Sequence, residues 1–395
     1  MVHKPLTVAW ISDFPVEWLP NLPAQLQTLP RRHPATWQIV LLSEFEKNPN
    51  LRLHIILLRG RIEADFSFER NGVNFHILKA PPWLRLASLF WTDTQLIQRA
   101  CKNIKPDLVH AWGIEKGAAL IGLRLNYPCL VTVQGLFAWY KQIVPLPAYY
   151  RFIAHLEKTS LPRAGLVTTE STFAVEFLRK RFPGLRVHQA EHAPNSTFFE
   201  IQRRPQIDPV EFISIGELSF RKGTDLLITA LERLRSEFPF RCTLISGPDR
   251  SYLSSLRPRI SPALQEQIDF KEHLLPNQVA KALETPTLML LPTRADVSPN
   301  AIKEAVVAGV PVVASQVGGI PDYVQPLKNG ILFPPGDIKG FMEAIRTAQK
   351  HSLLGRGQVE PASLQSSRAY LSPARMAQNF LSAYDRLLET VRVSG

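Results

Sequence analysis

The sequence contains little cysteine and no long apolar run. Its three cysteines, Cys101, Cys129 and Cys242, lie far apart and form no CxxC pair. This excludes a disulfide framework and a CxxC-type zinc site, so we expect free thiols in a reducing cytosol. No stretch of about 18 apolar residues occurs, and the run Leu6–Ile11, followed closely by Asp13, is too short for the core of a signal peptide. The sequence therefore predicts a cytoplasmic protein without a membrane span.

Blocks of like charge are also missing, although the charge is unbalanced. There are 46 Lys and Arg residues against 34 Asp and Glu residues, a formal net charge of +12, but no run of five or six basic residues. A nucleic-acid partner is therefore not expected. An excess of this size suits a phosphorylated substrate or a peripheral position on anionic headgroups at the inner face of a membrane.

The glycine-rich loop of dehydrogenases is absent as well. Glycine is modest, at 20 residues, and no GxGxxG follows the first expected strand in either half of the chain, which argues against an NAD-dependent enzyme. The 33 prolines are scattered without a period, so collagen and a proline-rich linker are excluded. Hydrophobic residues make up 45% of the 395 residues and charged residues 20%, which is typical of a globular protein of two or three domains.

Short apolar runs alternate with longer helical patterns along the whole chain. Such alternation predicts an α/β fold with mostly parallel sheets covered by helices on both faces. The expected strands of the first half are Leu6–Ile11, Trp37–Leu42, Leu53–Leu58, Val73–Leu78, Asp107–His110, Leu130–Val133, Gly165–Thr168 and Val187–Ala190. Those of the second half are Phe212–Ile215, Cys242–Ser246, Ile268–Phe270, Thr287–Leu291, Val310–Ala314 and Gly330–Phe333.

Two further segments divide the chain into domains. Pro194–Pro209 is polar and bracketed by prolines, and we interpret it as an interdomain linker. Ser372–Val391 has apolar residues at helical spacing, which predicts a helix that packs by this stripe. We expect two Rossmann-like domains, residues 1–194 and 195–371, and a C-terminal helix and tail, residues 372–395. Such domains bind ligands at the carboxyl ends of their strands.

The stretch Leu290–Val324 is the most informative part of the sequence. It predicts a strand, a loop, a capped helix, a second strand and a glycine loop. Ser298 is expected to cap the helix and Pro299 to occupy its first position, where the missing N–H costs nothing. Gly309 stands where a left-handed residue ends a helix, and Pro311 prevents its continuation.

Polar groups gather around the start of this expected helix. The free amides of Asn300 and Ala301 would point out of its N-terminus, which is a suitable site for a diphosphate. Glu304 lies one turn further in, and Asp296 precedes the cap by two residues. An ordinary buried helix with surface carboxylates would explain the caps, but not an acidic loop followed by Gly318-Gly319.

These residues resemble the signature of glycosyltransferase family 4, whose members are retaining enzymes with the GT-B fold. In that family an E-x7-E motif precedes a small-residue helix and a G-x-P-V-V-A-S segment. Asp296 and Glu304 stand at the two acidic positions, and Gly309–Ser315 matches the segment. The Asp-x-x-Pro-Asn opening resembles a variant found in capsule and exopolysaccharide enzymes. The resemblance implies that Asp296 contacts the hydroxyls of the donor sugar and that Glu304 binds the nucleotide ribose.

The first strand of the second half carries another landmark of the family. Gly216, followed by Arg221 and Lys222, resembles the "G-R-…-K-G" loop that clamps the diphosphate. Lys222 matches the lysine of this loop, whereas Glu217 stands where the family has arginine, and Arg221 is a candidate for the missing charge. A solvated turn is the alternative reading of Arg221-Lys222.

Three weaker matches complete the resemblance. Gly247 resembles the family's "G-x-G-P" loop, and His273 and Leu274 lie where backbone usually holds the base. In the first half, the strand ends around His110 and Gln134 resemble "P-D-V-V-H-x-H-G" and "x-T-x-H-G". These ends would border the cleft where donor sugar and acceptor meet, with Glu115 as a further candidate; His110 is equally well read as a core histidine.

The resemblance implies two Rossmann-like domains facing each other across a cleft, with the C-terminal helix packing back on the N-terminal domain. The implied reaction transfers a sugar, with retention, from a nucleotide diphosphate sugar to the hydroxyl of a glycan, glycolipid or small molecule. No DxD-like motif is evident, and Lys222 with the helix N-terminus could neutralise the diphosphate, so no metal and no cofactor are expected. The alternatives are an inactive nucleotide-binding GT-B scaffold and a GT-B sugar-nucleotide epimerase.

Overall fold

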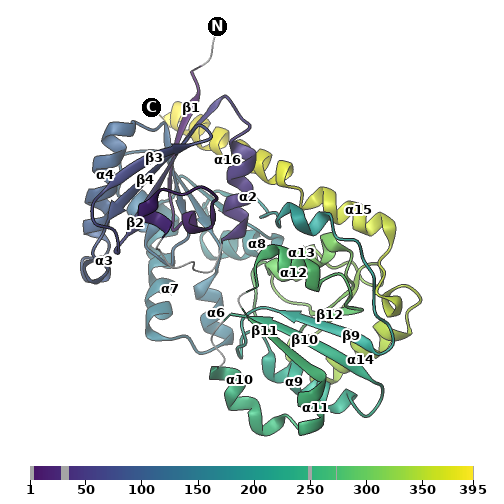
Figure 1. The fold of residues 1–395 in the computed structure, drawn as a ribbon. Helices are drawn as coiled ribbons and strands as arrows, with labels where there is room; N and C mark the ends of the chain where they lie inside the picture. Colours follow the sequence, from purple (N-terminus) through teal and green to yellow (C-terminus); the bar gives the residue numbers. More distant parts are fainter. Residues whose placement is uncertain (1–3, 28–34, 248–250, 273, 395) are drawn as a thin grey trace. The chain divides into compact units, whose positions relative to one another are not determined.

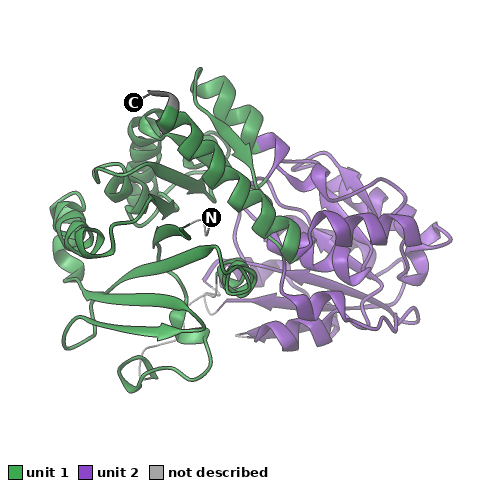
Figure 2. Cartoon of the chain, turned by 90° about the horizontal axis from the view of Figure 1, so that it is seen from above, with its two compact units in different colours: residues 1–170, 174–193, 373–395 green, residues 171–173, 194–372 purple. Residues whose placement is uncertain are grey.

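The computed structural model describes residues 4–27, 35–247, 251–272 and 274–394, which form two compact units (Figure 1, Figure 2). Unit 1 combines the chain up to residue 170 with residues 174–193 and 373–395, and unit 2 combines residues 171–173 with 194–372. Each unit has its own sheet with helices packed against it.

The sheet of unit 1 has the strand order β3-β4-β2-β1-β5-β6-β7-β8. Its strands are parallel except at the edge, where β3 pairs antiparallel with β4. Buried apolar runs such as β5 and β6 form the interior because both of their faces are covered. The strands are β1 (Leu6–Ile11), β2 (Leu51–Arg59), β3 (Phe66–Arg70), β4 (Val73–Lys79), β5 (Leu108–Trp112), β6 (Cys129–Val133), β7 (Leu166–Thr169) and β8 (Val187–Gln189). The helices are α1 (Ala24–Gln27), α2 (Thr36–Phe45), α3 (Pro82–Ala87), α4 (Trp91–Ile104), α5 (Ala118–Gly122), α6 (Phe137–Ile143), α7 (Ala148–Ser160), α8 (Thr172–Arg181), which starts in residues of unit 2, and α16 (Pro373–Ser394).

For this unit, one predicted strand was wrong and one strand was missed. The expected strand Trp37–Leu42 is the helix α2, because an apolar run of six residues does not by itself distinguish a buried strand from a buried helix. The strand β3 was not predicted. Its hairpin with β4 is closed by Asn71 and Gly72, both with positive φ (50° and 76°), and this Asn-Gly pair was the available signal.

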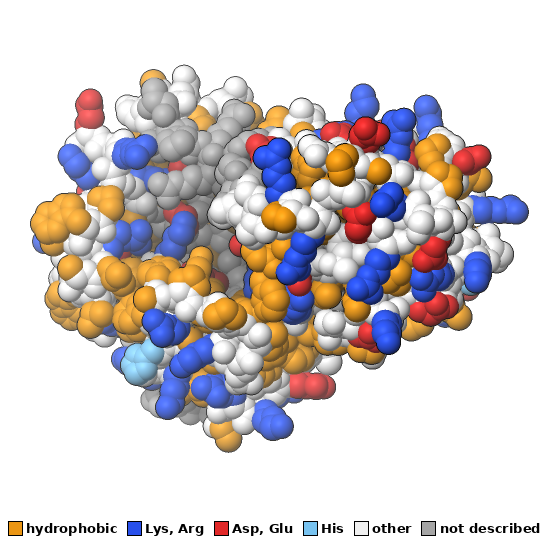
Figure 3. All heavy atoms as spheres, turned by 90° about the horizontal axis from the view of Figure 1, so that it is seen from below, with side chains coloured by type: hydrophobic (Ala, Val, Ile, Leu, Met, Phe, Trp, Pro, Cys, Tyr) orange, Lys and Arg blue, Asp and Glu red, His pale blue; other side chains and the backbone are white. Residues whose placement is uncertain are grey.

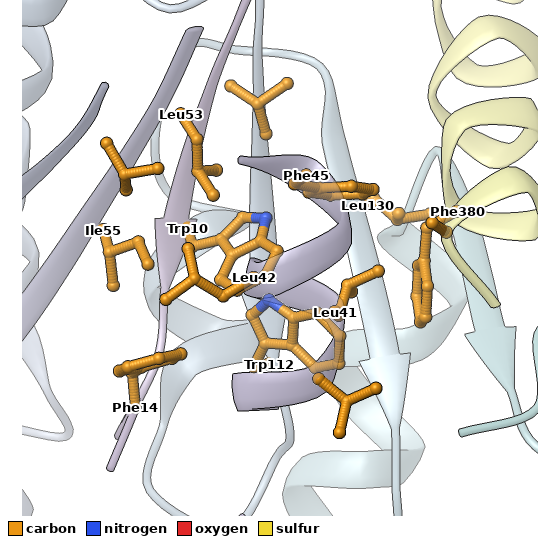
Figure 4. Packing of buried hydrophobic residues seen from close by; sticks show 14 of the residues in the cluster. Trp10, Phe14, Leu41, Leu42, Phe45, Leu53, Ile55, Trp112, Leu130 and Phe380 are labelled. Carbon is orange, nitrogen blue, oxygen red and sulfur yellow. The ribbon is translucent and has the colours of Figure 1, made fainter. Parts of the chain in front are cut away.

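The core of unit 1 is built around Trp10 on β1. Leu42 of α2 lies beside its indole, and Leu41 lies beside Trp112 (Figure 4). The Phe45 ring of α2 lies 5.9 Å from the Trp10 ring, centroid to centroid. The indole N–H donates to the hydroxyl of Tyr384 on α16 at 2.9 Å, and both rings are fully buried. The C-terminal helix therefore packs back on the first half of the chain, as predicted.

The sheet of unit 2 is entirely parallel in the described residues, with the order β11-β10-β9-β12-β13-β14. All six strands expected for the second half are present. They are β9 (Val210–Ile215), β10 (Phe240–Ser246), β11 (Ile268–Glu272), β12 (Leu288–Leu291), β13 (Val312–Ser315) and β14 (Gly330–Phe333). The helices are α9 (Thr224–Leu234), α10 (Ser251–Leu256), α11 (Pro262–Gln267), α12 (Pro276–Ala282), α13 (Asn300–Ala308), α14 (Ile338–Lys350) and α15 (Pro361–Tyr370).

The segment interpreted as a linker is packed on unit 2. Phe198 is buried in a core cluster of this unit. The Arg203 guanidinium donates to the carbonyls of Glu284 at 2.9 Å and Gly357 at 3.0 Å. The polar composition of the segment therefore reflects side chains that bind the backbone of unit 2.

Candidate functional site

The candidate site of unit 2 lies at the carboxyl ends of β9 and β12. These strands are neighbours in the sheet, and β9 has β10 on its other side, so the strand order reverses between them. A reversal of this kind opens a crevice at the carboxyl edge of a parallel sheet, where α/β proteins bind ligands. The loop after β9 carries Arg221 and Lys222, and the loop after β12 carries Asp296.

The two loops are joined by an ion pair. The Lys222 ammonium contacts the Asp296 carboxylate, and both side chains are largely buried. The Arg221 guanidinium lies 3.8 Å from the same carboxylate and donates to the Ala295 carbonyl at 3.1 Å. Asp296 is therefore surrounded by two cations from the facing loop.

Glycine is required where these loops touch. Gly223 follows Lys222 with a φ of +74°, and a Cβ at this position would lie 1.9 Å from the Pro292 carbonyl oxygen. The Arg294 N–H donates to the Arg221 carbonyl at 2.8 Å. Backbone contacts thus hold the loop of Lys222 against the loop that follows β12.

Glu217, which stands where the family has arginine, forms an ion pair with Arg221 at 3.1 Å. The Glu217 side chain is 61% exposed, so most of it projects into solvent. Arg221, in contrast, reaches toward Asp296 and lies beside Lys222 in the chain. The structure thus places the Arg221 guanidinium at the site, and its role toward a diphosphate stays a prediction.

The start of α13 differs from the prediction. Pro299 is the capping residue, with φ −72° and ψ 119°, and the helix begins at Asn300. Ser298 does not cap it: the hydroxyl of Ser298 bonds to the Tyr323 hydroxyl at 2.7 Å, and its N–H donates to Asp296 at 3.2 Å. This local turn at Asp296 displaces Ser298 from the helix terminus.

The first turn of α13 nevertheless has backbone N–H groups that form no hydrogen bond within the helix, because they lie at its N-terminus. Asn300 and Ala301 are the first two helical residues, so their N–H groups have no acceptor within the helix. At the other end, Gly309 has a φ of 79° and terminates the helix, as predicted. The helix thus directs amide donors toward the same edge of the sheet that carries Lys222.

Glu304 lies one turn inside α13 and is partly buried. Burial raises its pKa to about 7, although the neighbouring Lys303 ammonium acts in the opposite direction. Lys303 is itself fully buried, with its ammonium 6.0 Å from the centroid of the Tyr323 ring. Glu304 is therefore a carboxyl group that changes charge near neutral pH.

Other candidates lie on neighbouring loops of unit 2. Gly216 directly follows β9 with a φ of 146°, and Gly247 directly follows β10. Leu274 is partly buried between β11 and α12, whereas His273 lies outside the described residues. The sequence did not predict that Gly319 contacts the Asp296 loop. The Gly319 N–H donates to the Asp296 carbonyl at 3.4 Å, and a Cβ at Gly319 would lie 2.2 Å from the Val297 carbonyl oxygen. The pair Gly318-Gly319 was the available signal.

In unit 1, the structure corrects the expectation that His110 borders the cleft. Its imidazole is completely buried, and its nitrogens bond to the Tyr384 hydroxyl at 2.9 Å and the Thr132 hydroxyl at 2.6 Å. Burial and the nearby His192 hold the pKa of His110 well below its ordinary value. His110 is a core residue because the pleat of β5 directs its side chain onto α16.

Gln134 and Glu115 approach each other at the carboxyl edge of the unit 1 sheet. Gln134 directly follows β6, and Gly113 directly follows β5. A Cβ at Gly113 would lie 2.5 Å from a Glu115 carboxylate oxygen and 3.9 Å from the Gln134 side-chain oxygen. The Ile114 N–H donates to Glu115 at 2.9 Å, and burial raises the pKa of this carboxyl. Together these side chains offer polar groups that can bind hydroxyls.

Two family models match the chain. A model described as "Glycosyl transferases group 1" matches residues 209–351, and one described as "Glycosyltransferase Family 4" matches residues 39–195. Together they cover most of both units.

Several curated proteins are similar to the chain over part of their length. Glycogen synthase from Mycobacterium tuberculosis is 24% identical over 62% of this chain and 61% of that protein. The sulfoquinovosyl transferase SQD2 of Arabidopsis thaliana is 26% identical over 70% of this chain and 57% of its own length. The putative colanic acid biosynthesis glycosyltransferase WcaL of Escherichia coli is 29% identical over 35% of each chain. The matched region thus spans less than two thirds of each relative.

Solved structures resemble the whole chain. Sucrose-phosphate synthase from Thermosynechococcus elongatus superimposes with a TM-score of 0.78 at 16% identity, covering 98% of this chain and 100% of that one. Anabaena HepE, solved in complex with UDP-glucose, gives a TM-score of 0.69 at 14% identity, covering 96% and 99%. The predicted GT-B fold class is confirmed by these similarities.

Proposed function

We propose that this chain transfers a sugar from a nucleotide diphosphate sugar to an acceptor hydroxyl with retention. The basis is that the chain belongs to glycosyltransferase family 4 and has the GT-B fold. The observation that carries the proposal is the arrangement at the carboxyl ends of β9 and β12. Lys222, Arg221 and the free amides of α13 belong to one edge of this sheet. Cations and helix amides together form a site for a diphosphate.

The ion pair between Lys222 and Asp296 suggests how a donor would be accepted. A bound diphosphate competes with Asp296 for the Lys222 ammonium, because it brings more negative charge to the same position. Asp296, once released from Lys222, can accept hydrogen bonds from the hydroxyls of the donor sugar. The Glu304 carboxyl, one turn into α13, is assigned to the hydroxyls of the ribose.

In the proposed reaction, the bond between the anomeric carbon and the diphosphate oxygen breaks, and a bond to the acceptor oxygen forms on the same face of the sugar. The acceptor proton passes to the departing phosphate oxygen. The protein then has to stabilise the negative charge that develops on the diphosphate, which Lys222 and the amides of α13 do without reorganising. Under this proposal neither a metal nor a cofactor is required.

The acceptor is assigned to unit 1. Gln134 and Glu115 offer amide and carboxyl groups at the carboxyl edge of its sheet, and a glycan, a glycolipid or a small molecule would supply the hydroxyl. HepE supports the donor class, because that protein was solved with UDP-glucose and with UDP.

The rival proposal is an inactive GT-B scaffold that binds nucleotides. Glu217 is its best support, since it replaces a cation of the family loop, but Arg221 brings a cation to the same loop. A thermal-shift screen of nucleotide sugars identifies the donor, because only a ligand that binds the folded state stabilises it. With that donor, NMR of the product's anomeric proton tests transfer and retention. Tight donor binding without turnover with any acceptor would support the scaffold, and an inverted product would contradict retention.

A further inference from the structure

Large apolar side chains are exposed along one edge of unit 1. In the described part of this unit, the exposed large apolar side chains lie on the segments that follow the carboxyl ends of β4 and β6. Four of them occur within nine residues: Trp83 is 74% exposed, Leu86 45%, Leu89 50% and Trp91 53%. We call these four residues the apolar rim. In Figure 3, hydrophobic side chains gather together with Lys and Arg at the left edge, the side on which Figure 1 places α3.

The turn between α3 and α4, which carries Leu89 of the rim, is held in an unusual backbone conformation. Leu89 and Phe90 both have positive φ, 47° and 61°, which non-glycine residues rarely adopt. Phe90 is buried against Gly117, where a Cβ would lie 2.5 Å from the Phe90 ring. The Arg124 guanidinium donates to the Leu89 carbonyl at 2.7 Å. These contacts anchor Phe90 inside the unit and keep its neighbours Leu89 and Trp91 outside.

A guanidinium group lies beside the rim, and the next acidic residue in the sequence is held in an ion pair. The Arg124 guanidinium lies 5.4 Å from the centroid of the Trp91 ring. Burial and, after it, the charge of the exposed Arg163 lower the pKa of Arg124. Asp93, the first acidic residue after the rim, is buried and paired with Arg85 at 2.7 Å. A guanidinium group beside an exposed indole, with a second basic residue acting on it, favours an anionic ligand.

We propose that the apolar rim docks unit 1 on a lipid bilayer that contains anionic headgroups. Exposed tryptophan and leucine with adjacent arginine is the composition that inserts into the headgroup region of a membrane. The excess of basic residues over the whole chain, +12, adds attraction to an anionic surface. In the part of the chain that the structure describes, none of the helices has the length and hydropathy of a membrane span.

Docking by this edge has a consequence for the acceptor, which rests on the proposed function. The rim connects to the polar groups of unit 1: Arg85 donates to the Lys116 carbonyl at 3.2 Å, and the Tyr149 hydroxyl donates to the Glu115 carbonyl. Glu115 therefore lies beside the segments that carry the exposed apolar side chains, and the matching acceptor is a hydroxyl of a lipid-linked sugar.

Vesicle co-sedimentation of the full chain, without a donor, tests the docking. We expect binding to phosphatidylcholine–phosphatidylglycerol vesicles of about 7:3 molar ratio, weaker binding to phosphatidylcholine alone, and weakening by salt. Trp83→Ser combined with Trp91→Ser should reduce the partition coefficient roughly tenfold or more. Ile207→Ser combined with Leu327→Ser, at exposed apolar positions of unit 2, is the matched control and should change nothing.

A charge variant separates headgroup attraction from apolar insertion. Arg163→Glu should weaken binding to the anionic vesicles by roughly fivefold or more, whereas Lys281→Glu, at an exposed position on α12, should have a smaller effect. Circular dichroism verifies that each variant is folded, and quenching of tryptophan fluorescence by brominated lipid should be lost in the double tryptophan variant.

Three outcomes would overturn the proposal: equal binding of the double tryptophan variant and the wild type, absence of binding to anionic vesicles, or a dimer in solution that the tryptophan substitutions dissociate. The last would assign the rim to a second copy of the chain. A donor-active enzyme that ignores vesicles contradicts only the docking. A chain that binds vesicles but no nucleotide sugar contradicts only the proposed function.

Discussion

Lys222 and Asp296 form an ion pair across 74 residues of sequence, from loops that follow two adjacent strands of unit 2. Neither loop has regular structure at this point, yet the pair is held by Gly223, which permits the loops to touch. Under the proposed function, this pair is the resting state of the diphosphate site.

Lys222→Ala should therefore lower kcat more than it raises KM. If the departing diphosphate gains charge in the transition state, loss of the facing cation costs roughly 10²–10³ in kcat. Lys222→Gln should recover little, because an amide supplies a dipole without a charge. Single-turnover kinetics with the identified donor measure the effect. A variant that changes only KM would show that Lys222 merely binds substrate.

Glu304→Gln should change how both stability and donor affinity depend on pH. The pKa of Glu304 is raised from 4.5 to about 7 in the folded protein, so the folded state holds this proton more tightly than the unfolded state. The wild-type free energy of unfolding should then fall as the pH rises from 4.5 to 7. Above this range the substitution should stabilise the protein by up to about 3 kcal/mol, and below it the two proteins should be alike.

Donor binding gives the functional half of this test. An ionised Glu304 accepts ribose hydroxyls more strongly, so wild-type affinity for the nucleotide sugar should increase as the pH rises through 7. At pH values above 7, Glu304→Ala should weaken binding of the nucleotide sugar by roughly 1.5–3 kcal/mol. Calorimetry measures both effects, and an unchanged affinity in Glu304→Ala would remove this residue from the site.

Glu217→Arg should leave donor affinity nearly unchanged, whereas Arg221→Gln should weaken it by about 1 kcal/mol or more. The reason is that Arg221 already reaches the Asp296 carboxylate, at 3.8 Å, while Glu217 projects into solvent. Calorimetry with the same donor compares the two variants. A clear gain in Glu217→Arg would mean that Arg221 does not supply the missing charge.

His110→Ala and Gln134→Ala should separate stability from catalysis in unit 1. Removal of the buried His110 takes one hydrogen bond from each of two buried hydroxyl groups and creates a cavity, which should cost about 3 kcal/mol of stability. Gln134→Ala should leave stability nearly unchanged and lower the rate of transfer. Urea denaturation and steady-state kinetics of the folded variants give the comparison; a stable but inactive His110→Ala would restore its catalytic assignment.

Gly223→Ala should disturb the lysine loop. The added Cβ would lie 1.9 Å from the Pro292 carbonyl oxygen, at a φ that alanine rarely adopts. Gly247→Ala is the matched control for stability, because a Cβ there meets nothing within 4 Å. We expect a lower melting temperature for Gly223→Ala only, and weaker donor binding by Gly223→Ala than by the wild type. Equal behaviour in thermal-shift measurements would contradict the packing described for the loop.

The sequence alone determined the order of the strands in unit 2 and the motif residues on its loops. Continuous apolar runs such as Leu288–Leu291 predict buried parallel strands, and Gly309 followed by Pro311 predicts the end of α13, because these signals act within a few residues of the chain. The Asn71-Gly72 turn of the β3–β4 hairpin is a signal of the same local kind.

Only the tertiary structure decided which neighbour each of these residues meets. The run Trp37–Leu42 is helical because it packs beside Trp10 and α16, and His110 is a core residue because Tyr384, 274 positions away, binds its ring. In the same way, contacts with distant segments decide that Arg221 reaches Asp296 and that Trp83 and Trp91 remain exposed. Local periodicity records which side of an element is apolar, but burial and charge pairing depend on contacts between segments far apart in the chain.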